Sequence, residues 1–222
     1  MLLPRSRSLP YVVPFALFMA LLALMPHLGV ALRLEQVIRL TLVGATLLLF
    51  SRPVLDLRVH RGLGSVLVGV GVFVVWIGPD LLWKGYHELP LFRNWFIGEV
   101  GNGFPDAGRE DPIAISLRFL RAAVLVPIIE ELFWRAWLPR RISSADFERV
   151  PLGAYTPVAF WITAVLFAVE HGAYWDVGLL AGIAYNWWMR TTKSLGDCVL
   201  AHAVTNACLS AYVVAAGRWE YW

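Results

Sequence analysis

The sequence contains 222 residues, of which 59% are hydrophobic and only 16% are charged, and 11 are tryptophan. A soluble domain of this length does not have such a composition, so the chain is predicted to be an integral membrane protein. The formal net charge of +3 is spread along the chain, without the basic block that binding to nucleic acid needs. The lipid bilayer is therefore an expected partner, and nucleic acid is not.

Seven apolar segments predict an all-α, polytopic membrane protein with about seven transmembrane helices, in a single domain over residues 1–222. Backbone inside a bilayer must satisfy its own hydrogen bonds, so each segment is expected to be helical. The first segment has no charge from Tyr11 to Val30, which is long enough to cross ~30 Å of hydrocarbon. The fifth and sixth are only about 15 residues long, and partial crossing by these two would let the polar residues described below meet. In chain order the segments cover residues 11–30, 36–51, 63–83, 113–138, 156–171, 176–190 and 198–216.

The long connection from Lys84 to Pro112 carries aromatic and acidic residues and is predicted to be an interfacial loop or a substrate cap. Alternate connections are basic, which places the amino terminus in the cytoplasm and the carboxyl terminus outside a cell membrane that the chain crosses several times. Arg33, Arg39 and Arg93 fall on the other side. The residues that give this orientation are Arg5, Arg7, Arg52, Arg58, Arg61, Arg140, Arg141, Arg149, Arg190 and Lys193.

The fourth segment contains PIIEELFWRAW, in which two adjacent carboxylates lie in an apolar helix. Charged groups at membrane depth are expensive and indicate function by default. Glu131 and Arg135 are four residues apart and share a helix face, so they are expected to pair. Glu130 lies about 100° around the helix without a partner in its own segment, which suits a general base. Pro127 removes a hydrogen bond to the carbonyl of Ala123, and an opened turn there would let water reach Glu130.

Two later segments carry polar groups at the same helical spacing. The motif FAVEH places Phe167 and His171 on one face, and HAVTN places His202 and Asn206 on another. If the three faces converge, Glu130 could take a proton from a water that His171 positions, and His202 with Asn206 could donate hydrogen bonds to an oxyanion. The expected reaction is hydrolysis of a peptide bond within the membrane. The same Glu130, His171 and His202 also have the donor types for zinc, so the residues by themselves leave a metal site open.

These three motifs resemble those of a known family, the type II CAAX prenyl endopeptidases and their bacterial relatives, the CPBP intramembrane proteases, also called the Abi family. The family pattern is EExxxR on one helix, FxxxH on a second, and HxxxN or HxxxD on a third. Here the matching stretches are EELFWR, FAVEH and HAVTN, in the same order, within a motif-bearing core at residues 113–216. The length and the ending GRWEYW are similar to a CAAX-protease-related group found beside bacterial exosortase systems.

The resemblance implies roles residue by residue. It implies that Glu130 activates water with help from His171, and that His202 and Asn206 stabilise the tetrahedral intermediate. It also implies that Glu131 and Arg135 hold the site together, with Phe167 in support. Such enzymes have been called metalloproteases, but the resemblance favours a metal-independent mechanism with no required cofactor. The implied substrate is a protein or peptide, and in the type II enzymes it is prenylated.

Two other classes of function fit the same residues. A membrane scaffold, or a protein that binds a peptide or lipid without cleaving it, would use the polar cluster as a binding site. A small transporter would use the Glu and His residues as a proton relay, but the sequence shows no internal repeat to support it.

The remaining polar and aromatic residues are given structural roles. Residues 113–122 are predicted to form an amphipathic stretch at the interface, because Arg118 and Arg121 fall within it. Tryptophan residues are expected to be interface anchors. No role is assigned to His27, His60 or His87. The tryptophans include Trp187, Trp188, Trp219 and Trp222.

Overall fold

The computed structural model describes residues 7–94 and 103–222, and the regular elements in this part of the chain are all helical. The predicted all-α membrane fold is confirmed. Five helical stretches are long and apolar enough to cross a bilayer, since each has at least 19 residues and reaches about 28 Å at 1.5 Å per residue. They are Leu9–His27, Leu32–Ser51, Gly62–Leu82, Pro112–Ser143 and Leu195–Ala216.

Each of the seven predicted segments contains a helix, but seven is only an approximate count of membrane spans. Helix α7 (Pro157–Glu170) has 14 residues, about 21 Å, which is shorter than the hydrocarbon layer. Helix α8 (Trp175–Thr192) is not among the five candidate spans, and it carries Asp176 and Arg190. The prediction that the fifth and sixth segments are short is thus met by α7, which pairs with α8 through a turn at Gly172–Tyr174.

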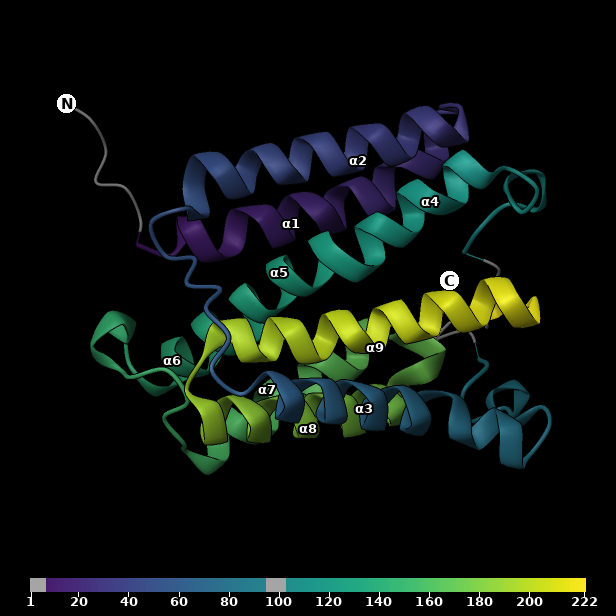
Figure 1. Ribbon diagram of the computed structural model, residues 1–222. Helices are drawn as coiled ribbons and strands as arrows, with labels where there is room; N and C mark the ends of the chain where they lie inside the picture. The colour runs from purple at the N-terminus through teal and green to yellow at the C-terminus, as the bar shows by residue number, and fades with distance from the viewer. Residues whose placement is uncertain (1–6, 95–102) are drawn as a thin grey trace.

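The helices lie side by side in a bundle (Figure 1). In that view α1 and α2 lie at the top, α4 and α5 run obliquely across the middle, and α3, α7, α8 and α9 lie below. Helix α9 packs along α3, and α7 packs along α8. The longer helices not yet bounded are α1 (Leu9–Leu24), α2 (Leu32–Thr46), α3 (Gly62–Leu82) and α9 (Leu195–Ala216), and a π-turn at Leu47–Ser51 extends α2. Short helical turns lie at Met25–His27, Tyr86–Glu88, Asp106–Gly108, Phe147–Arg149 and Trp219–Tyr221.

The central helical rod over Pro112–Ser143 changes its winding on both sides of the paired glutamates. It begins where the Asp111 side chain accepts hydrogen bonds from the backbone N–H groups of Ile113 and Ala114. A π-turn inserts the equivalent of one residue and rotates everything beyond it around the helix axis. The two π-turns therefore set which side of the rod the glutamates face. The rod consists of α4 (Pro112–Leu120), a π-turn (Arg121–Leu125), α5 (Val126–Glu131), a second π-turn (Leu132–Trp137) and α6 (Leu138–Ser143).

Small residues let the helices that carry the motifs approach closely. A Cβ added at Gly69 of α3 would lie 2.3 Å from the carbonyl oxygen of Ala201 on α9. A Cβ added at Gly178 of α8 would lie 3.2 Å from the Cβ of His171. Contacts of this kind are how helices associate in a bilayer, where lipid is as apolar as the side chains. Glycine at these positions thus brings α9 against α3 and brings the end of α7 against α8.

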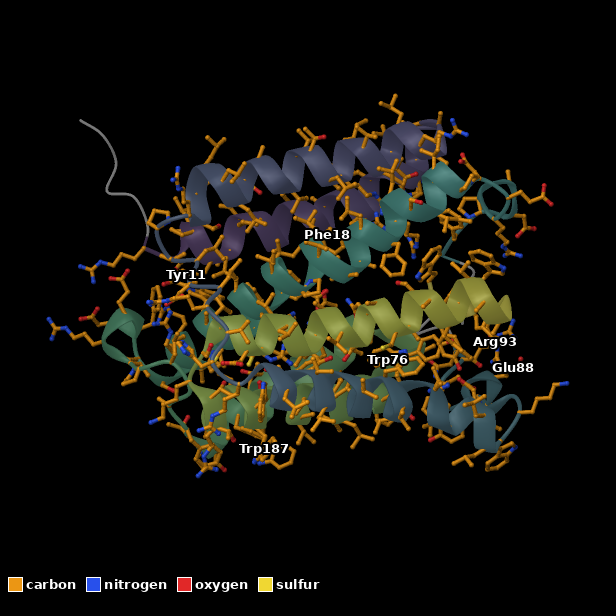
Figure 2. The ribbon with its side chains drawn as sticks, viewed as in Figure 1. Tyr11, Phe18, Trp76, Glu88, Arg93 and Trp187 are labelled. Carbon is orange, nitrogen blue, oxygen red and sulfur yellow. The ribbon has the colours of Figure 1, made fainter. Side chains whose placement is uncertain are left out.

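The outer surface is apolar, as a bilayer requires, with Leu48 and Leu82 among the exposed side chains. Trp187 lies on the outside of the bundle, while Trp76 lies among the side chains between α3 and α9 (Figure 2). One of the predicted interface anchors, Trp188, is corrected. Trp188 is 6% exposed and donates a hydrogen bond to Ser65 Oγ at 3.2 Å, because Gly64 has no side chain and so leaves room for its ring. Trp222 lines an internal cavity.

The positions predicted at the amino terminus and in the long connection are only partly described. Arg5 and residues 95–102 lie outside the described part of the chain. The described part of the connection contains two short helical turns, at Tyr86–Glu88 and Asp106–Gly108.

Candidate active site

A cavity of about 210 Å³ lies where the central rod meets α7 and α9. Its wall includes Glu130 from α5, Phe167 and His171 from the end of α7, and His202 and Asn206 from α9. The three sequence motifs therefore converge, as expected from their faces. The four residues with predicted catalytic roles and the supporting Phe167 share one cavity.

Glu130 has a carboxylate that is almost buried and incompletely paired. Its side chain lines the cavity while the residue is 6% exposed. Its Oε2 atom has no hydrogen-bond partner among the described residues. The nearest cationic group recorded for it is His202, whose Nε2 lies 3.9 Å from Oε2, beyond hydrogen-bond length. A buried carboxylate oxygen without a donor is costly and is available to hold a water molecule.

Glu131 is fully buried and contacts an imidazole and a guanidinium at once. Its Oε1 accepts a hydrogen bond from His202 Nδ1 at 2.8 Å, and its Oε2 lies 3.3 Å from Arg135 Nε. The predicted pairing of Glu131 with Arg135 is present, since four residues on a helix place them on one face. The bond to His202, 71 positions away on α9, has no local signature and was missed from the sequence.

Arg135 is held by aromatic faces as well as by its carboxylate partner. Its guanidinium carbon lies 4.3 Å from the ring centre of Phe167 and 5.2 Å from that of Tyr185. Three buried guanidinium nitrogens have no hydrogen-bond partner within the described residues, so cation–π contact is a substantial part of what compensates the buried charge. Phe167 thereby supports the site by seating Arg135 beneath the cavity.

His171 ends α7 with a defined ring orientation. Its Nδ1 lies 2.7 Å from the carbonyl oxygen of Phe167, and a carbonyl only accepts, so Nδ1 carries the proton. The other nitrogen, Nε2, then presents a lone pair when the ring is neutral. The ring packs edge-on against Trp76 at 5.1 Å between centroids, which fixes it at the cavity wall.

Asn206 is anchored by the unusual winding of the central rod. Its Nδ2 donates to the carbonyl oxygen of Ala122 at 2.9 Å. The π-turn uses bonds from each N–H to the carbonyl five residues back, as Val126 N–H to Arg121 shows. In that register the N–H that Pro127 lacks would have bonded Ala122, not Ala123 as the α-helical spacing predicted. Asn206 therefore fills the gap that Pro127 leaves.

Tyr185 on α8 is a site residue that the sequence analysis did not select. Its ring stacks on His202 with centroids 5.0 Å apart and planes at 21°. Its hydroxyl donates to Thr205 Oγ1 at 2.7 Å, and Thr205 donates to the carbonyl of Gly69 at 2.8 Å. These two hydrogen bonds connect the Tyr185 ring, which covers His202, to α3. A lone tyrosine in an apolar helix gives no sequence signal for such a role.

Glu170 lies next to His171 in the sequence but belongs to a different environment. Its Oε2 accepts a hydrogen bond from Trp134 Nε1 at 2.9 Å, and it is not part of the cavity wall. This placement gives it a structural role between α7 and the central rod.

The side chains around Glu130 were predicted to have the donor types for zinc. Among the described residues, no group of three His, Cys, Asp or Glu side chains is arranged to hold a metal ion. His202 Nδ1 is engaged by Glu131 and His171 Nδ1 by Phe167, so only the Nε2 atoms remain available as nitrogen ligands near Glu130. Histidines that bind zinc through Nε2 make Nδ1 contacts of the same kind, so these contacts are compatible with either mechanism, and the chemistry below is built on the protein's own side chains.

A second buried histidine lies outside the cavity and ties the long connection to the bundle. His87 contacts Asp80 Oδ2 through Nδ1 at 2.7 Å and Asp176 Oδ1 through Nε2 at 3.0 Å. Burial by itself lowers the pKa of this imidazole, but the hydrogen bonds that its ring donates to Asp176 and Asp80 outweigh burial, and the pKa of His87 is raised above 6.5. Tyr221 also donates to Asp80 Oδ2 at 2.7 Å, so the carboxyl-terminal turn joins this cluster.

Comparison with known proteins identifies one matching family. Residues 112–208 match the family model described as type II CAAX prenyl endopeptidase Rce1-like. The match covers every motif residue from Glu130 to Asn206, and the predicted family resemblance is confirmed for this part of the chain. No curated protein and no solved structure gives a match.

Proposed function

We propose that this chain, a multi-pass membrane protein with an Rce1-like domain at residues 112–208, is an intramembrane endopeptidase in which Glu130 activates water. The observation that carries the proposal is the unpartnered Glu130 carboxylate oxygen in a cavity shared with two imidazoles and an amide. A scaffold would gain nothing from a buried carboxylate left without a donor, whereas a general base needs one.

The first step is attack on the peptide carbonyl. A water in the cavity donates a proton to Glu130 while the lone pair on His171 Nε2 orients it, and the water oxygen bonds to the carbonyl carbon. The Nδ1–H bond to the Phe167 carbonyl keeps the ring of His171 in the tautomer that this step needs. The product is a tetrahedral intermediate with a negative oxygen.

The second step is collapse of the intermediate. The oxyanion is stabilised by the amide of Asn206 and by His202, whose protonated ring donates through Nε2. Glu131 accepts a hydrogen bond from His202 Nδ1 at 2.8 Å, which holds the ring in the orientation that this donation needs. The carbon–nitrogen bond then breaks, and the proton held by Glu130 moves to the leaving amine. Atoms balance with one water consumed and no other reactant.

The substrate is proposed to be a protein or peptide segment that reaches the cavity from the bilayer or its surface. The helices around the cavity include spans long enough to cross the bilayer, and the cavity wall extends to Trp222 in the carboxyl-terminal turn. A lipid group near the scissile bond is the modification that the family name suggests. We place the amino terminus in the cytoplasm, because the basic connections share its end of the bundle.

The test compares peptide termini across membrane proteomes of cells that express the wild type, Glu130→Gln, or the matched control Glu148→Gln at equal level. Glu148 is exposed in a connection and pairs with Arg7, so its substitution leaves the cavity unchanged. The proposal predicts that a defined new terminus appears with the wild type and with Glu148→Gln, and is lost with Glu130→Gln. The residue at the lost terminus states whether the substrate carries a prenylated cysteine.

An unchanged set of termini in Glu130→Gln cells, with the folded protein present, would contradict the proposal. A persisting phenotype of gene deletion in that case would favour a binding protein of the same fold. Reporter fusions at each connection test the orientation, and a cytoplasmic signal from the connection after α3 would overturn it.

A further inference from the structure

The same cavity has a strongly basic wall that the proposed chemistry does not use. Arg118 and Arg121 line it together with Glu130. Arg121 is 4% exposed, and its Nη1 has no hydrogen-bond partner among the described residues. Arg118 lies over the rings of Phe104 and Trp222, at 5.6 Å and 5.3 Å from their centres, and its Nε is likewise unpartnered within the described chain. These arginines are not the solvent-facing residues of an amphipathic interfacial helix, which the sequence had suggested.

The charges around these arginines do not balance. Arg39 of α2 lies within electrostatic range of both, and it is also buried. Glu35 is the carboxylate that acts electrostatically on both arginines within the described part of the chain, and it already pairs with Arg39 at 2.5 Å. A buried cation without a counter-charge is strongly unfavourable. Among the described residues, no carboxylate forms an ion pair with Arg121 or Arg118, although both line a cavity that is open to a ligand.

We propose that Arg121, assisted by Arg118, forms a subsite that binds a carboxylate of the peptide substrate, either its terminal carboxylate or an acidic side chain. The inference rests on the proposed function, since it gives that cavity a second point of contact with the same substrate. A guanidinium binds a carboxylate through two parallel, charge-assisted hydrogen bonds, which gives direction as well as affinity. The subsite would fix where along the peptide the cut falls.

The spacing along the central rod gives the register. Arg121 precedes Glu130 by nine residues, which is about 13 Å along a helix. An extended peptide covers that distance in about four residues at ~3.3 Å each. The bound carboxylate is therefore expected about four residues from the scissile bond.

The position of Arg121 favours a peptide over a lipid head group as the source of the anion. Arg121 is 4% exposed and lies in the wall of the same cavity as Glu130, so an anion bound there lies beside the groups proposed to cut a peptide. The aromatic residues Trp76 and Tyr221 in the same wall suit contact with peptide side chains.

The first experiment measures cleavage by the purified protein in phosphatidylcholine nanodiscs. The probe is a randomised library of internally quenched ten-residue peptides. One pair of libraries differs at the carboxyl terminus, which is either a free carboxylate or a carboxamide. A second pair differs at one internal position, which is either glutamate or glutamine. Wild type is expected to cleave the carboxylate form about 10- to 100-fold more efficiently than its neutral counterpart, as a charge-assisted bond of this kind predicts. The terminal pair and the internal pair distinguish the two sources of carboxylate.

The variants assign that preference to the subsite. Arg121→Gln is expected to remove the preference and retain cleavage of the neutral probe, while Arg121→Lys restores part of it. The matched control is Arg141→Gln, an exposed arginine at the far end of the same rod, which keeps the full preference. Equal cleavage of both forms by wild type, or an equal fall for both forms in Arg121→Gln, would overturn the subsite. Arg118→Gln repeats the comparison if Arg121→Gln does not fold.

A binding measurement separates this inference from the proposed function. Thermal unfolding of Glu130→Gln protein is followed with N-acetyl-trileucine as the free acid or the carboxamide, and the free acid is expected to raise the midpoint more, through Arg121. If the wild type shows no cleavage at all and the free acid still raises the midpoint more than the carboxamide does, the endopeptidase proposal fails and the subsite stands. If the difference is absent, the subsite fails whatever the cleavage result. The comparison is repeated in nanodiscs that contain phosphatidylglycerol. Disappearance of the free-acid effect in these nanodiscs would show that an anionic lipid head group competes for Arg121, and would overturn the peptide assignment.

Discussion

The bond between Asn206 and Ala122 gives the sharpest test of how the central rod is built. Two substitutions probe it, Asn206→Ala and Pro127→Ala, made singly and together. Asn206→Ala removes the 2.9 Å hydrogen bond and leaves the Ala122 carbonyl without a donor. Pro127→Ala supplies a backbone N–H in the position from which the π-turn register reaches the same carbonyl. The second change should therefore compensate for the first.

The size of the coupling follows from the cost of an unsatisfied carbonyl. In the wild-type background, Asn206→Ala is expected to lower the free energy of unfolding by about 1–3 kcal/mol. In the Pro127→Ala background the carbonyl already has a backbone donor, so the same change removes a dispensable bond. The two substitutions are then expected to be coupled by about 1 kcal/mol or more, which is beyond the scatter of independent sites.

The assay is reversible unfolding in detergent micelles, followed by tryptophan fluorescence for the four proteins of the cycle. Asn186→Ala is the matched control, because Asn186 Nδ2 makes the same kind of bond to the carbonyl of Phe160, also at 2.9 Å, away from Pro127. Its effect should simply add to that of Pro127→Ala. Additive effects of Asn206→Ala and Pro127→Ala would refute the π-register explanation of this bond.

Three further predictions follow from close contacts and from the charges. Gly69→Ala is expected to destabilise the protein by more than about 2 kcal/mol, because the added Cβ would lie 2.3 Å from a backbone oxygen of α9. Gly71→Ala is the control in the same thermal unfolding assay and should be neutral or stabilising, because its Cβ would have nothing within 4 Å. Glu131→Gln should lower the free energy of unfolding by about 3–5 kcal/mol by leaving a buried cation unpaired, and an effect below about 1 kcal/mol in detergent unfolding would contradict the role given to this carboxylate. The raised pKa of His87 means that its tie to the bundle is complete below pH 6.5 and is lost as the pH rises through the folded-state pKa. Hydrogen exchange of residues 84–94 should therefore quicken with pH beyond its intrinsic rate in the wild type but not in His87→Gln, and equal profiles would count against the tie.

The sequence by itself predicted the helices and the contacts made within each helix. The fourth apolar segment, predicted at 113–138, is the core of the rod at Pro112–Ser143, because a long apolar segment in lipid satisfies its backbone hydrogen bonds by forming a helix. The pairing of Glu131 with Arg135 and the meeting of Phe167 with His171 also follow from local spacing, since residues four apart share a face. Motif order further predicted the family resemblance, which the match confirms for residues 112–208. The catalytic roles and the absence of a required metal stay predictions.

Only the tertiary structure decided how the motifs meet across helices. The bond from His202 to Glu131 joins positions 71 apart, and the contact of Asn206 with Ala122 joins positions 84 apart. Neither is visible in a local pattern, because both depend on the π-turns that rotate the rod about its axis and on glycines that set the distance between helices. The burial of Arg121 in the cavity wall has the same origin, since one inserted residue turns a side chain by about 100° from the face that α-helical periodicity assigns to it. Local hydrophobicity determines that these segments are helices, and tertiary packing determines which helix faces contact one another.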